Sequence, residues 1–169
     1  MKTMDSIGLK LCSYQAKLFE ESLQRTECSS GIFIRRFMNS ELSARMDRNG
    51  FLFEATNVWD AIDEVEMQYG TSNYGREKYN SEEMHWIGYI YRYWAYTHRM
   101  SSKRVYKIVK PDYLRKMYYP YHSLDPMQAI ERLKEELHAE YDTDPTDIER
   151  GVRILREVRR RAALRAQSR

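Results

Sequence analysis

Apolar residues recur every three or four positions along most of the chain, with polar residues between them. The clearest set comprises Val58, Ile62, Val65 and Tyr69. This spacing places side chains on one face of an α-helix. Thr56 or Asn57 stands as the N-cap before the set, and Gly70 follows it as a stop signal. The pattern therefore predicts an amphipathic helix over residues 58–69.

Similar periods predict further helices on both sides of this one. Their approximate ranges are 11–23, 33–46 with a break near Asn39 and Ser40, 105–109, 112–118, 126–141 and 146–162. Asp125 and Pro126 give one of them an N-cap followed by a proline at the first helical position. Residues 51–53 are strand-like, but no second run could pair with them, so we expect a buried linker there. The sequence predicts an all-α fold, a single multi-helix bundle.

An aromatic helix is expected at the centre of this bundle. Asn80 and Glu83 have the spacing of a capping box, and aromatic residues follow on nearly every side of the helix that they begin. A helix tolerates this when other helices or a partner surround it. The residues expected to form the structural core are Trp86, Tyr89, Tyr93 and Trp94. The alternative is that part of this helix is an exposed binding face.

Residues 70–79 have no hydrophobic period and contain two glycines. They are the best candidate for a long exposed loop, and loops of that length often carry function. We therefore take Tyr74, an aromatic residue within this loop, as a candidate contact for a partner.

Charge is unevenly distributed along the 169 residues, whose formal net charge is +3. Residues 148–169 contain eight arginines and two glutamates, a balance of +6, so the other residues carry 3 − 6 = −3. We expect a helical domain over residues 1–142 and a basic, arginine-rich amphipathic helix over 143–169. No apolar run approaches the roughly 20 residues of a membrane helix. Cys12 and Cys28 could form at most one bridge, and with no signal peptide we expect a reduced, cytoplasmic protein without membrane contact.

Two Glu-x-x-His motifs, Glu82 with His85 and Glu135 with His138, have the spacing seen in di-iron helical bundles. With 25 acidic residues in the chain, chance explains such pairs. Each histidine also falls near a predicted helix end, whereas di-iron ligands lie deep in the bundle. The common nucleophile, phosphate-binding and zinc-protease motifs are missing. We expect no catalytic residue, metal or cofactor, and a metal-dependent helical enzyme is the weakest alternative.

The stretch 91–118 also fits a helix-turn-helix DNA-binding regulator. The nucleic-acid-binding candidates in it are Arg99, Lys103, Arg104 and Lys107. Cations among tyrosines are typical of phosphate contacts. The alternative is that Val105 and Ile108 pack inward while these cations solvate the outer face.

Four segments carry a resemblance to a known family. They are 32–38 (Ile-Phe-Ile-Arg-Arg-Phe-Met), 45–47 (Arg-Met-Asp), 86–94 (Trp-Ile-Gly-Tyr-Ile-Tyr-Arg-Tyr-Trp) and 119–126 (Tyr-Pro-Tyr-His-Ser-Leu-Asp-Pro). Over about residues 9–137 the chain resembles short bacterial proteins designated antitoxins, found beside toxin genes.

The resemblance implies a protein without catalysis that binds and neutralises a toxin protein. The arginine-rich tail after Asp144 differs from the sequences of the family, and we expect it to be a second segment that binds the partner. Its candidate contacts are Arg153, Arg156 and Arg160, in addition to Tyr74. DNA as a partner and a homo-oligomer stay open.

Overall fold

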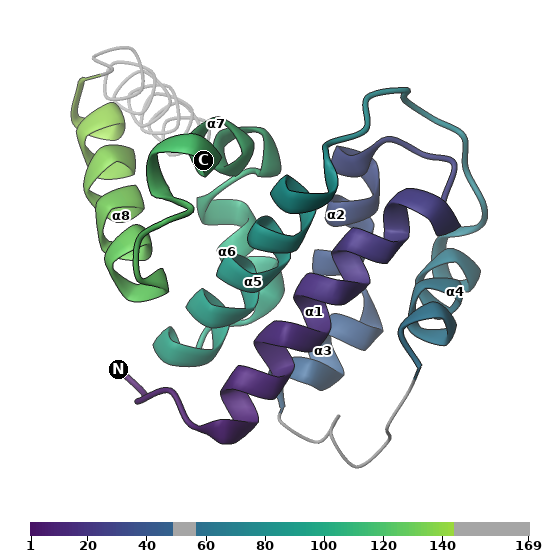
Figure 1. Cartoon of the computed structure of the whole chain (residues 1–169), viewed down its shortest axis with the longest axis horizontal. Helices are drawn as coiled ribbons and strands as arrows, with labels where there is room; N and C mark the ends of the chain where they lie inside the picture. The colour runs from purple at the N-terminus through teal and green to yellow at the C-terminus, as the bar shows by residue number, and fades with distance from the viewer. Residues whose placement is uncertain (49–56, 144–169) are drawn as a thin grey trace, which may run out of the picture. The chain divides into compact units, whose positions relative to one another are not determined.

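The chain is all-α. The computed structural model describes residues 1–48 and 57–143, and these contain eight helices and no strand (Figure 1). The helices are α1 (Ser6–Arg25), α2 (Ser30–Met38), α3 (Glu41–Asp47), α4 (Val58–Tyr69), α5 (Ser81–His98), α6 (Ser102–Ile108), α7 (Pro111–Tyr121) and α8 (Pro126–Thr143).

Local caps explain where most helices begin. Asn57 caps α4, and Gly70 ends it, as the sequence predicts. The predicted capping box is confirmed at α5: the Asn80 side chain accepts a hydrogen bond from the Glu83 N–H, and the Glu83 carboxylate accepts one from the Asn80 N–H. The predicted break lies between α2 and α3, where Ser40 caps the second of them.

Several helices extend past their predicted ends, and α1 and α7 show two causes. α1 begins at Ser6 instead of near Leu11, because Ile7 and Leu9 are 44% and 47% exposed and so obscure the apolar period. α7 continues through Pro120 to Tyr121, although the prediction ended it at 118. A proline so close to a helix end removes only one of the last backbone hydrogen bonds.

The core forms where α1 packs along α5 (Figure 1). The backbones come so close at Gly88 that a Cβ atom there would lie 2.8 Å from the Gln15 carbonyl oxygen and 3.0 Å from the Ala16 Cα. Phe19 of α1 contacts Phe33 and Phe37 of α2 edge-to-face, with ring centroids 5.8 and 5.1 Å apart. These contacts hold α1 against α5 and α2 against α1.

The four aromatic residues expected in the core differ in burial. Trp94 is 1% exposed and Tyr93 is also buried. Trp86 and Tyr89 are half-buried, although Trp86 contacts Tyr118 edge-to-face. The expected core role is therefore complete only for Trp94 and Tyr93, because the first turns of α5 are not covered on every side.

Two compact units follow one another along the chain, Met1–Ile130 and Glu131–Arg169. The boundary expected at residue 142 stays a prediction, because 144–169 lie outside the described residues, as does the linker expected at 51–53. Cys12 and Cys28 are buried and unbridged. Within the described part of the chain, no helix has the length and apolar character needed to cross a membrane.

Candidate functional site

The segment from Gly70 to Tyr79, here the 70–79 segment, joins α4 to α5 without regular secondary structure (Figure 1). Its backbone is bonded to the beginning of α2. The Ser29 N–H donates to the Tyr74 carbonyl and the Ser30 N–H to the Glu77 carbonyl, each at 3.0 Å. The Tyr79 N–H donates to Ser30 Oγ at 2.9 Å. These three bonds fix the conformation of a stretch that has no helix of its own.

Two basic side chains, one from α2 and one from the segment itself, attach the segment to α1 and α2. Arg36 Nη1 donates to the Gly70 carbonyl oxygen at 2.8 Å. Lys78 Nζ donates to the Thr26 carbonyl oxygen at 2.7 Å, and burial lowers the pKa of this lysine. Thr26 is the C-cap of α1, so the Lys78 ammonium lies at the negative end of the helix dipole, where a cation is stabilising.

The end of the segment is attached to α7. The Tyr79 hydroxyl donates to the Asp112 carboxylate, and burial together with this bond raises the pKa of Tyr79. Arg115 pairs with Glu77 and with Glu83, the latter at 3.1 Å from Nε. The Arg115 guanidinium also lies 4.4 Å from the centroid of the Tyr79 ring.

Gly75 allows the close approach of the segment to α2. Its φ is +76°, which favours glycine, and a Cβ atom there would lie 2.7 Å from Ser29 Oγ. Tyr74, immediately before it, has 73% of its surface exposed. The segment thus holds an aromatic side chain out from the molecule on a fixed backbone.

The remaining sequence-predicted contacts lie in different places. Arg99 is the C-cap of α5, and Lys103, Arg104 and Lys107 lie on α6. All four are exposed. The tail candidates Arg153, Arg156 and Arg160 lie outside the described residues.

Neither a protein-family model, a curated protein nor a solved structure matches the chain.

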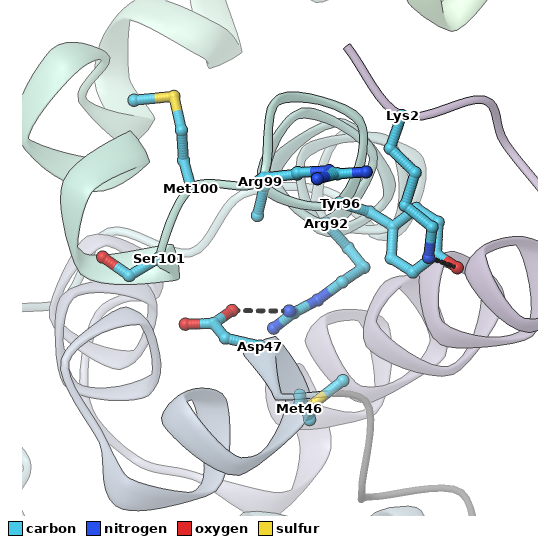
Figure 2. Close-up of a pocket in the computed structure, with 9 residues that line it drawn as sticks. Lys2, Met46, Asp47, Arg92, Tyr96, Arg99, Met100 and Ser101 are labelled. Atoms are coloured by element: carbon cyan, nitrogen blue, oxygen red, sulfur yellow. Dashed lines mark hydrogen bonds and ion pairs between the residues drawn. The ribbon is translucent and has the colours of Figure 1, made fainter.

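A pocket of about 400 Å³ opens beside the C-terminal end of α5 (Figure 2). The residues that line it are Lys2, Met46, Asp47, Arg92, Ala95, Tyr96, Arg99, Met100 and Ser101. Of these, only Arg99 is among the residues that the sequence singles out.

Arg92 lies at the base of this pocket and is 1% exposed. Its Nη1 donates to Asp47 Oδ1 at 2.7 Å, its Nε to Gln15 Oε1 at 2.8 Å and its Nη2 to Ser102 Oγ at 3.0 Å. Asp47 also accepts the Ser102 N–H at 2.8 Å. Burial lowers the pKa of Arg92, against the opposing effect of Asp47. The network joins α1, α3, α5 and α6.

Sequence reasoning missed Arg92, although a single cation among aromatic residues is a signal for a buried charge that needs a partner.

As for metals, no group of three His, Cys, Asp or Glu side chains in the described ranges could hold an ion. His85, from one of the Glu-x-x-His pairs, lies 3.3 Å from the Glu20 carboxylate.

Proposed function

We propose that the protein is an antitoxin-like binder that occludes a toxin protein, and that Tyr74 is a central contact. The observation that carries this proposal is the exposure of Tyr74 on a segment whose backbone is bonded to α2. That the partner is a toxin protein is inferred from the resemblance of the sequence to bacterial antitoxins.

The physical argument concerns the entropy of binding. A flexible loop of ten residues would lose conformational freedom when it met a partner. The bonds from Ser29, Ser30 and Arg36 restrict the 70–79 segment before any partner arrives. Tyrosine offers a large contact area with few rotatable bonds and is enriched among residues that dominate binding energies. Met67 and Tyr69, 84% and 39% exposed, bring further apolar surface on the preceding helix.

The test uses the product of the neighbouring gene in the host as the toxin candidate, co-expressed and then titrated by calorimetry after nuclease treatment. We expect Tyr74→Ala to weaken the complex by about 30-fold, which corresponds to the ~2 kcal/mol of a hot-spot residue. Growth protection in co-expression should fall in parallel. The thermal unfolding of the variant should be nearly unchanged, because the side chain is exposed.

Tyr119 provides a matched control. It is 74% exposed and lies on α7, away from the 70–79 segment in sequence. Tyr119→Ala should leave the affinity unchanged. Equal affinities of the wild type and Tyr74→Ala would exclude Tyr74 as the contact, and absence of a complex would overturn the proposed function. Arginine-to-alanine variants at 153, 156 and 160 test the tail separately.

A further inference from the structure

Arg99 ends α5 with a left-handed backbone, φ 52° and ψ 43°. The Met100 N–H donates to the Ala95 carbonyl and the Arg99 N–H to the Tyr96 carbonyl, at 2.9 and 3.4 Å. This is a Schellman motif, and glycine is its usual residue at the position of Arg99. Among the described residues Arg99 is the only non-glycine with positive φ. Since the left-handed region is unfavourable for a non-glycine residue, the backbone does not account for an arginine here.

The Arg99 side chain lines the 400 Å³ pocket and is exposed. Within residues 1–48 and 57–143, its guanidinium has no carboxylate or other acceptor as a partner. In Figure 2 it extends toward the side of the pocket occupied by Lys2 and the Tyr96 ring. A planar set of five donors, unpaired among the described residues, therefore faces a cavity.

Two more cations line the pocket from other parts of the chain. Lys2 is held there because its N–H donates to the Thr97 carbonyl at 2.7 Å and its ammonium lies 3.7 Å from the centroid of the Tyr96 ring. Arg92 forms the base.

The carboxylates nearby offset only part of this charge. Asp47 pairs with Arg92 at 2.7 Å, and Asp5 lies 3.5 Å from the Lys2 ammonium. No carboxylate of the described residues pairs with Arg99, so the pocket favours an anion.

We propose that this pocket binds the phosphate group of a small phosphate monoester, with Arg99 as its principal contact and Lys2 as the second cation. Arginine matches phosphate oxygens with two parallel hydrogen bonds, and a lysine adds a compact charge. The volume of about 400 Å³ lies within the range of small-molecule sites. This site is separate from the 70–79 segment, and its proposal does not rest on toxin binding.

The test is calorimetric titration of the full chain with inorganic phosphate and with glycerol 3-phosphate, at constant ionic strength set with chloride. Arg99→Gly removes the guanidinium while supplying the residue that the left-handed backbone favours, so the variant should unfold at or above the temperature of the wild type. We expect both ligands to bind the wild type saturably and Arg99→Gly at least tenfold more weakly. Lys10→Ala removes an exposed cation of α1 that does not line the pocket, and its Kd should stay within twofold of the wild type.

Three outcomes would overturn the proposal: no saturable binding by the wild type, an unchanged Kd in Arg99→Gly, or equal weakening in Lys10→Ala. A DNA duplex is the second probe. Binding of the duplex that depends on Arg99 and falls steeply with salt, without binding of either phosphate ligand, would assign Arg99 to a nucleic-acid backbone instead.

Discussion

The contact between α1 and α5 at Gly88 allows a quantitative test of the packing. Gly88→Ala adds one methyl group, whose carbon would lie 2.8 Å from the Gln15 carbonyl oxygen, 3.0 Å from the Ala16 Cα and 3.0 Å from Phe19 Cγ. Two of these atoms belong to the backbone of α1 and cannot move by a change of rotamer. The helices must therefore separate, or α5 must bend.

Two opposing effects set the size of the change. Overpacking a core typically costs about 1–3 kcal/mol, whereas replacing glycine by alanine inside a helix gains about 1 kcal/mol. Because the clash involves backbone, we take the upper end of the first range and expect a net loss of about 2 kcal/mol. For a chain of this size that corresponds to a fall of roughly 4–8 °C in Tm.

Urea unfolding followed by circular dichroism gives the free energy of unfolding, and calorimetry gives the Tm. Gly31→Ala in α2 is the control, because a Cβ there would meet only the Tyr79 hydroxyl oxygen, at 3.7 Å. Its stability should be unchanged or raised by up to about 1 kcal/mol. If Gly88→Ala were as stable as Gly31→Ala, the close approach of α1 and α5 would be refuted.

Two further predictions concern charged groups. Arg92→Met should lower the free energy of unfolding in urea by about 3–5 kcal/mol, because it leaves the partly buried Asp47 without its cation. Adding Asp47→Ala to this variant should recover part of the loss, and no recovery would contradict the pairing of the two residues. Hydrogen bonds from the Tyr96 hydroxyl and the Gly8 N–H lower the Asp5 pKa from 3.8 to about 2. Because its pKa is depressed, Asp5 stabilises the fold above pH ~4 and loses this effect as the pH falls toward 2. Titration of the carboxyl group by NMR should show a clearly higher Asp5 pKa in a Tyr96→Phe variant. An unchanged pKa would count against the hydrogen bond between Tyr96 and Asp5.

Local signals made the helices predictable. The cap at Asn57, the stop at Gly70 and the capping box of Asn80 and Glu83 each lie within a few residues of the end that they define, so a single sequence contains the whole signal. The end of α7 was misplaced because Pro120 is a strong breaker in general but is tolerated in a last turn.

The candidate sites depend on contacts that are distant in sequence. Arg92 meets Gln15 and Asp47, which are 77 and 45 positions away, and no period or motif links such residues. Likewise the exposed loop at 70–79 could be predicted from its composition, but its attachment to Ser29 and Asp112 could not. Folding brings these groups together, so only the structure identifies the pocket and the fixed segment.

The anchoring of the 70–79 segment has a practical consequence for protein engineering. From Tyr74 to Tyr79 the register is fixed by backbone bonds to Ser29 and Ser30, so an inserted residue there would displace several of them at once. Residues 71–73 precede these bonds, and lengthening a connection costs little entropy. A short tag inserted between Thr71 and Ser72 would therefore lie close to Tyr74 and would keep the bonds to Ser29 and Ser30 as well as the one from the Tyr74 N–H to Ser72 Oγ.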